Sequence, residues 1–314
     1  MIRTPPAALA LVLVAAPVAP GQQRPPSPEA RDAATGHLSP RHLRITRNLE
    51  YARYGDRRLL LDLYIPARTD TQALPVIVVV RGGGWLLGDK EGFAFIAGYL
   101  ADAGFASVCI EYRPSGEAAF PAAISDVKAA VRWVRANAAR LRFDPNQIGA
   151  IGGSSGGHLV ALLGASADVP ALEGSGGNNG LSSRVAAVVA MAPLTDLRAR
   201  WLQTGGRDGF IETFLGPPIT PQDNRLVLAS PINYVNINAP PLLLIHSRTD
   251  STVPYEQSLR LKARYEELGR PVELVTLADA PHAFWNSSRW FPETMNWVVD
   301  FFRHTLGRQG ALIR

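Results

Sequence analysis

The segment at residues 148–158, with the sequence IGAIGGSSGGH, constrains the fold of this chain more than any other. A short apolar strand runs into a glycine–serine turn, and an apolar helix start follows at 159–164. A turn of this kind holds a serine in strained backbone geometry at the end of a sheet, and the flanking glycines let neighbouring backbone pass close by. The helix beneath it offers N–H groups and a positive dipole end to an oxyanion. The segment therefore predicts a nucleophile elbow.

The glycine pattern fits two serines. The motif G-x-S-x-G matches with Ser154 at its centre and again with Ser155 at its centre. The motif alone is a moderate signal, because glycine–serine turns also occur in loops that merely join a strand to a helix. The residues by themselves leave both frames open.

Partners for a nucleophilic serine follow later in the chain. Such a serine needs a base, and the base needs an orienting carboxylate. Asp250 follows the apolar run at 241–246, and His282 follows the run at 272–277. Both are therefore expected in loops at the carboxyl ends of parallel strands, on the sheet edge that carries the elbow. The order Ser154, Asp250, His282 is the one expected of an α/β-hydrolase.

Other assignments of these residues stay open. Asp250 could serve only to cap the helix that begins near Pro254, and His282 could be an ordinary loop histidine. Asp279 is the rival orienter, although its place in the same loop favours a solvated side chain. His158 and His246 are weaker candidates for the base, because they fall in a helix turn and at the end of a buried strand.

A third glycine-rich segment follows the β-branched run at 76–80. Three glycines there can turn backbone N–H groups toward a ligand, as in the oxyanion loops of lipases and esterases. Gly83 and Gly84 are the candidate donors, and the N–H of Ser155 would complete the hole. A plain flexible loop is the alternative.

Further motifs along the chain point to one family. They are RGGGW at 81–85, GDK at 88–90, EYR at 111–113, the run from 120 to 133, DP at 144–145, GGSSGGHL at 152–159, SP at 230–231, Asp250 with VP at 253–254, and PH at 281–282. Over residues 45–305 the chain resembles α/β-hydrolase esterases of the hormone-sensitive-lipase-like group, and most of all the bacterial bifunctional feruloyl and acetylxylan esterases. The elbow of that family usually reads G-x-S-A-G-G, which aligns its nucleophile with Ser154.

The resemblance implies a mostly parallel, eight-stranded sheet with helices on both faces and a small lid. It also implies acyl transfer through Ser154, His282 and Asp250, without a metal or cofactor. One position departs from the family, because Arg81 stands where histidine is usual. A guanidinium donates hydrogen bonds but accepts none. We expect Arg81 to be a salt-bridged structural residue; stabilising an oxyanion or attracting an anionic substrate are the alternatives.

The remaining pattern predicts one domain at 43–307. A β-hairpin at 44–53 and 58–65 forms its antiparallel edge, strands follow at 105–112 and 185–191, and helices at 91–103, 121–140 and 155–166. Residues 174–183 read as a flexible polar loop, and residues 194–230 as a lid-like insertion. Four aromatic residues are candidates for a substrate pocket, each about as apt for core packing: Trp85, Trp201, Phe284 and Trp285.

The N-terminus predicts export. Residues 1–21 combine a positive start, an apolar stretch and small residues at the cleavage site, as a signal peptide does, and a Pro-rich linker follows at 22–42. The apolar stretch is short for a membrane span, so we expect no stable anchor. The basic residues are scattered despite a net charge of +5, and no nucleic-acid-binding module accompanies them. The single cysteine excludes an intramolecular disulfide.

These features predict an exported serine carboxylesterase, periplasmic or secreted. Its substrate is a small-molecule or polysaccharide-linked ester, with acetyl or feruloyl groups of plant-wall polysaccharide as the expectation from the resemblance. A hydrolase of another carbonyl bond, either arylformamidase-like or peptidase-like, is one alternative. A catalytically silent binding module is another. The oligomeric state cannot be derived from the sequence.

Overall fold

The computed structural model describes residues 43–67, 72–167 and 169–307. The predicted signal peptide at 1–21 and linker at 22–42 lie outside these residues. Eight strands form one sheet in the order β1-β2-β4-β3-β5-β6-β7-β8. The strands are β1 (Leu43–Tyr54), β2 (Arg57–Pro66), β3 (Leu74–Val80), β4 (Ala106–Ile110), β5 (Phe143–Gly153), β6 (Ala187–Met191), β7 (Leu242–Ser247) and β8 (Val272–Leu277).

Strand direction follows the predicted α/β-hydrolase pattern. Strand β2 pairs in antiparallel orientation with β1 and with β4, and the remaining pairings are parallel. The register aligns Val80 of β3 with Gly152 of β5, and Ser247 of β7 with Leu277 of β8. The parallel strands therefore end at one common edge, and the loops that follow them meet there.

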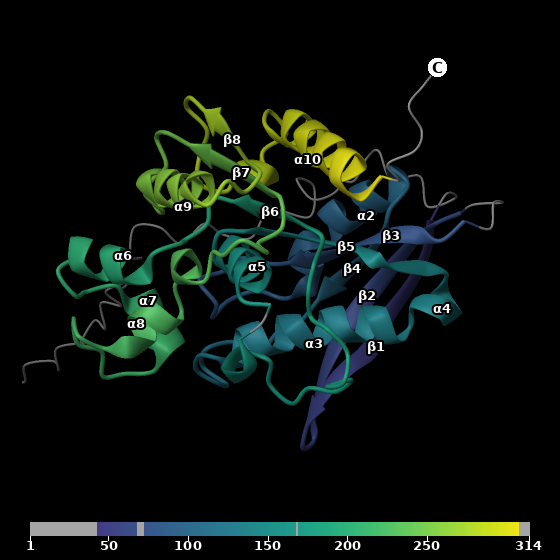
Figure 1. Ribbon diagram of the computed structural model, residues 1–314, viewed down its shortest axis with the longest axis horizontal. Coiled ribbons are helices and arrows are strands. Elements are labelled where there is room, and N and C mark those ends of the chain that lie inside the picture. The colour runs from purple at the N-terminus through teal and green to yellow at the C-terminus, as the bar shows by residue number, and fades with distance from the viewer. Residues whose placement is uncertain (1–42, 68–71, 168, 308–314) are drawn as a thin grey trace, which may run out of the picture.

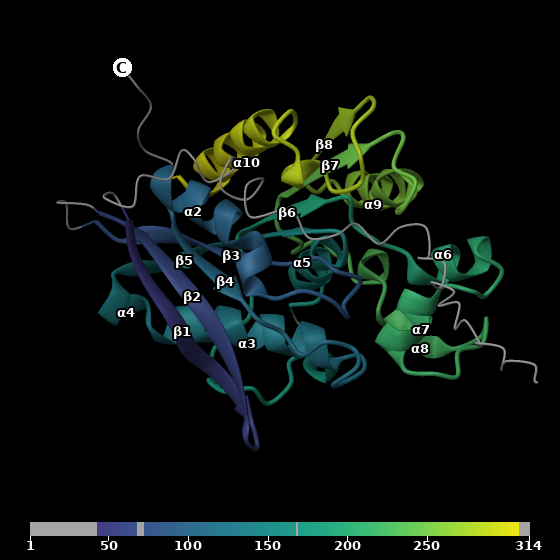
Figure 2. The same ribbon diagram turned by 180° about the vertical axis from the view of Figure 1, so that it is seen from behind.

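Helices cover both faces of the sheet, because its central strands are apolar on both sides. In β3, Val76, Val78 and Val80 enter one core, whereas Ile77 and Val79 enter the other. The first core is covered by α3 (Ala122–Ala136), α5 (Ser155–Ala165) and α9 (Glu256–Glu267), and the second by α2 (Ala94–Asp102) and α10 (Phe291–Leu306). Figures 1 and 2 show α2 and α10 on the side opposite α3.

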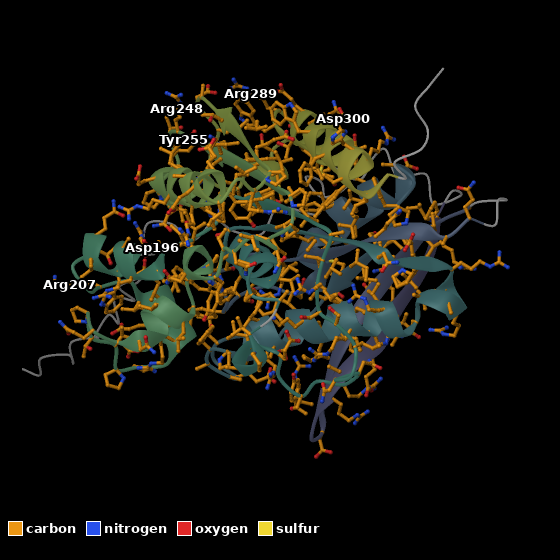
Figure 3. All side chains as sticks on the ribbon, viewed as in Figure 1. Asp196, Arg207, Arg248, Tyr255, Arg289 and Asp300 are labelled. Atoms are coloured by element: carbon orange, nitrogen blue, oxygen red, sulfur yellow. The ribbon has the colours of Figure 1, made fainter. Side chains whose placement is uncertain are left out.

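The insertion predicted at 194–230 holds three short helices. They are α6 (Leu197–Gln203), α7 (Gly209–Leu215) and α8 (Asn224–Leu228). An aspartate caps each N-terminus by accepting a backbone N–H bond: Asp196, Asp208 and Asp223. Figure 1 shows this group at one end of the molecule, and Asp196 lies between it and α9 in Figure 3. We call residues 194–230 the lid.

Two predicted helices begin or end differently in the structure. The helix expected at 91–103 starts with the 3-10 turn Lys90–Phe93 before α2. The helix expected at 121–140 breaks at Asn137, whose side-chain amide donates to the Trp133 carbonyl, and it continues as α4 (Ala138–Leu141). Such local side-chain bonds compete with a regular helix. In the described part of the chain, no helix is long and apolar enough to cross a membrane.

Candidate active site

Ser154 occupies the turn between β5 and α5. Its φ of 55° and ψ of −121° lie outside the regions that ordinary side chains prefer. The Ser154 N–H donates to the Met191 carbonyl of β6 at 2.8 Å, and its own carbonyl accepts from His158 N–H at 2.9 Å. A side chain at Gly156 would overlap the backbone of Val80 and Arg81. The strained turn thus depends on glycine beside it, as the sequence pattern predicts.

Ser154, His282 and Asp250 form one hydrogen-bonded chain. His282 Nε2 lies 2.9 Å from Ser154 Oγ, and His282 Nδ1 lies 2.7 Å from Asp250 Oδ2. The other carboxylate oxygen accepts the N–H groups of Thr252 and Val253, both at 2.9 Å. Asp250 therefore orients the histidine and fixes its own loop. It does not cap the following helix, because α9 (Glu256–Glu267) begins after Tyr255 without a side-chain cap.

The rival residues lie elsewhere. Ser155 Oγ is buried without a hydrogen-bond partner, whereas Ser154 Oγ is hydrogen-bonded to His282. Of the two serines that match the motif, Ser154 is therefore the one beside the histidine. Asp279 is 58% exposed and pairs with Arg289 at 3.4 Å. Arg289 lies at the upper margin of the molecule in Figure 3. Asp279 is thus a solvated surface residue.

A second histidine contacts the same carboxylate. His246 Nε2 lies 3.3 Å from Asp250 Oδ2 and 3.1 Å from the Val253 carbonyl, while Nδ1 lies 2.8 Å from Ser258 Oγ. Burial alone would raise the pKa of Asp250, but hydrogen bonds from His246 and His282 outweigh it and hold that pKa below the usual range. Asp250 is therefore an anion at neutral pH. The only sequence signal for His246 was its position near the end of the strand that precedes Asp250.

The glycine loop lies beside Ser154. A methyl carbon added at Gly82 would lie 3.4 Å from Ser154 Cβ. Gly83 has a φ of 111° and Gly84 a φ of 61°, which favour glycine. The N–H groups of Gly83, Gly84 and Ser155 donate to no protein acceptor among the residues that the structure describes. These three N–H groups therefore remain the candidate donors to an oxyanion at Ser154.

Arg81 differs from the sequence expectation. Its side chain is buried, with 4% of the residue exposed, and in the described residues no carboxylate pairs with it. Nη1 donates to the carbonyls of Gly82 and Leu87 and to the Tyr112 hydroxyl. The guanidinium carbon lies 4.2 Å from the centre of the Tyr112 ring. The expected salt bridge is absent because the glycine loop folds back and surrounds the cation with neutral oxygens.

The four aromatic pocket candidates are nearly fully buried. Trp85, Trp201, Phe284 and Trp285 are 1%, 2%, 0% and 3% exposed. Burial of this degree leaves almost no surface for a ligand, so core packing, the alternative left open by the sequence, describes them in this structure. Trp85 stacks on Phe214 of α7 with ring centres 4.3 Å apart. It thereby joins the glycine loop to the lid.

Phe210 is the aromatic residue that the sequence did not single out. It is 47% exposed, and a methyl group on Gly84 would overlap its ring. Phe210 and Phe214 are one helical turn apart on α7, over two adjacent residues of the glycine loop. Only the docking of the lid reveals that Phe210 borders the site.

His158 links three parts of the site. Its Nδ1 accepts the indole N–H of Trp85 at 3.0 Å, and its Nε2 donates to the Ala229 carbonyl after α8 at 2.7 Å. Complete burial lowers its pKa to about 4. A neutral imidazole in α5 therefore connects the glycine loop to the end of the lid. Among the described residues, no group of three histidine, cysteine or carboxylate side chains is placed to hold a metal ion.

Comparison with known proteins finds a matching family profile and similar esterases. The BD-FAE family profile matches residues 61–265. Esterase LipQ of Mycobacterium tuberculosis is 35% identical over 237 residues, which are 73% of this chain and 55% of that protein. The chain thus spans about half the length of this curated relative.

Solved structures share the whole fold. A truncated carbohydrate esterase from gut microbiota is 31% identical with a TM-score of 0.74, over 84% of this chain and 97% of the other. Esterase Est2 of the planctomycete Thermogutta terrifontis is 28% identical with a TM-score of 0.71, over 84% and 94% of the two chains. Est2 has also been solved with butyrate, with propionate and phosphorylated by paraoxon.

Proposed function

Since the chain belongs to the BD-FAE family of α/β-hydrolase esterases, we propose that it is a serine carboxylesterase acting through Ser154, His282 and Asp250. The observation that carries this proposal is the continuous hydrogen-bonded chain from Ser154 Oγ through both ring nitrogens of His282 to the ionised Asp250. The intact chain argues against a catalytically silent binding module.

Acylation begins with proton transfer. His282 Nε2 takes the hydroxyl proton while Ser154 Oγ forms a bond to the ester carbonyl carbon. The carbonyl π electrons move to its oxygen, which becomes an oxyanion facing the N–H groups of Gly83, Gly84 and Ser155. The Asp250 anion stabilises the imidazolium through the 2.7 Å bond at Nδ1. The oxyanion then collapses, the bond to the leaving oxygen breaks, and His282 gives its proton to the departing alcohol.

Deacylation repeats these steps with water. His282 takes a proton from water as the oxygen attacks the acyl-enzyme carbonyl. A second oxyanion forms in the same place and collapses, and the bond to Ser154 Oγ breaks. The proton on His282 returns to Ser154, so the products are one carboxylic acid, one alcohol and the unchanged enzyme.

The substrate we favour is a short acyl ester, such as an acetyl group on a carbohydrate. Support comes from the solved neighbours, one named a carbohydrate esterase and another solved with propionate and butyrate. Feruloyl esters of plant-wall polysaccharide belong to the same proposal and rest on the motif resemblance. The N-terminal 21 residues support export to the periplasm or beyond the cell.

Hydrolysis of p-nitrophenyl acetate by purified Ser154→Ala and Ser155→Ala tests the proposal. Ser154→Ala should lower kcat by at least about 10⁴-fold, because no covalent route remains. Ser155→Ala keeps its backbone N–H and should retain most of the activity, which makes it the matched control. Release of p-nitrophenol at the wild-type rate by Ser154→Ala would exclude this mechanism, and an inactive wild type would return weight to the formamide or peptide alternatives.

A further inference from the structure

Arg81 is a buried cation without a counter-charge. Its three acceptors are two carbonyls and a phenol, all neutral, and its Nε has no hydrogen-bond partner. Arginine keeps its positive charge at every pH that proteins normally meet. A buried charge is costly unless an opposite charge is near. The mechanism described above leaves this cation unused, although it lies inside the loop that carries the oxyanion donors.

The developing oxyanion is close to this charge. The methyl carbon of an alanine at position 83 would lie 3.5 Å from Arg81 Nη1. The amide nitrogen of the same residue lies about 2.5 Å from that carbon, and a bound oxyanion about 2.9 Å beyond the nitrogen. An oxyanion held by the Gly83 N–H therefore forms at most about 9 Å from the guanidinium.

We propose that Arg81 supplies the permanent positive charge that the oxyanion pairs with as it forms. The substrate ester is neutral, so the cation gains an opposite charge only in the tetrahedral intermediates and their transition states. Such an interaction raises kcat rather than tightening substrate binding. At an effective dielectric constant of about 20, unit charges about 9 Å apart change an equilibrium by roughly 20-fold. This inference rests on the proposed esterase function.

Neutral and charged replacements separate the charge from the hydrogen bonds. Arg81→Gln keeps donors to the loop but removes the charge, and Arg81→Lys keeps the charge but removes the planar fork. We expect Arg81→Gln to lower kcat on p-nitrophenyl acetate by about 10- to 100-fold with KM within about twofold. Arg81→Lys should stay within about fivefold of wild type in kcat, because the charge remains.

An inhibitor that mimics the oxyanion gives the second readout. A trifluoromethyl ketone adds to the serine and forms a charged tetrahedral adduct, so its Ki should rise across the variants in proportion to the loss of kcat/KM. Arg132→Gln is the control, since Arg132 is also buried but pairs with a carboxylate, that of Glu173. It should lower Tm and leave kcat and Ki unchanged.

Each outcome bears on the inference. Equal activity of Arg81→Gln and wild type overturns it, and so does equal impairment of the Gln and Lys variants, which would leave Arg81 a role in loop geometry only. If Arg81→Gln does not fold, Arg81→His assayed at pH 8, where free imidazole is mostly neutral, takes its place. An inactive wild type contradicts the proposed function instead, so the two failures are distinct.

Discussion

Phe210 is the residue whose side chain best explains how the lid could select substrates. Its half-exposed ring lies over Gly84, beside the proposed oxyanion hole. A sugar or aryl group of an ester bound there would pack on the ring, a contact worth about 1 kcal/mol or more. We expect Phe210→Ala to raise KM for acetylated xylotriose by about 5- to 10-fold and to leave KM for ethyl acetate nearly unchanged.

Leu202→Ala provides the comparison for this variant. Leu202 lies on the neighbouring helix α6 and is 55% exposed, so its removal changes the apolar lid surface to a similar degree. It should alter neither KM. An equal rise in KM for both esters in Phe210→Ala would show that the ring only shapes the glycine loop.

Single residues also show what the sequence could predict. Ser154, Asp250 and His282 could be predicted from the sequence, because each follows a recognisable apolar strand and the strand end defines its position. The environment of Arg81 could not be predicted, since it depends on how the glycine loop folds back over the Arg81 side chain. Phe210 was missed because its direction depends on the docking of α7 through Phe214 and Trp85.

Among the elements, the irregular segment after α5 is tied firmly to α3. Glu173 accepts hydrogen bonds from Lys128 at 2.6 Å, Arg132 at 2.8 Å and Ser183 at 2.8 Å, and both cations are buried. Arg132 Nε also donates to the Gly177 carbonyl. The segment at 174–183 lacks regular structure, as predicted from its glycines, but side chains of α3 hold its backbone in one place.

Removing Glu173 should therefore destabilise the fold. Glu173→Ala removes the carboxylate that pairs with the buried Arg132, and we expect a loss of about 3 kcal/mol and a fall in Tm of about 6–12 °C. Thermal unfolding measures the effect. Glu267→Ala on α9 breaks an exposed ion pair with Arg264 and should cost less than about 1 kcal/mol. Similar Tm values for the two variants would contradict the buried network.

Across the whole molecule, sheet topology brings distant residues together. Ser154 and His282 are separated by 128 positions, yet the common edge of β5, β7 and β8 places them in contact. The alternation of apolar runs and helices predicts parallel strands that end at one edge of the sheet, so this part of the site was predictable. The lid could be predicted as an insertion, but its packing could not. Its short helices contact the rest of the molecule through a few side chains, and the periodicity of so short a segment does not show which way those side chains point.

His158 couples the glycine loop, α5 and the lid, so its protonation should affect the stability of the entire fold. Its pKa is about 4 when folded, below the ordinary value of 6.5, because burial disfavours the charged ring. Between pH 6.5 and about pH 4, the histidine is therefore protonated in the unfolded chain and neutral in the folded chain. The stability from this histidine is complete above pH 6.5 and falls as the pH drops toward 4, by about 3 kcal/mol.

Urea unfolding at pH 7, 5.5 and 4.5 measures this loss. Acidic residues with lowered pKa values, Asp250 among them, also contribute as the pH falls, so the comparison must be with a variant. His158→Asn carries no titrating ring. It should be less stable than wild type at pH 7, because the bonds to Trp85 and Ala229 are weakened, yet lose less stability on acidification. Parallel pH profiles for the two proteins would assign the acid sensitivity to other groups and leave His158 a packing role alone.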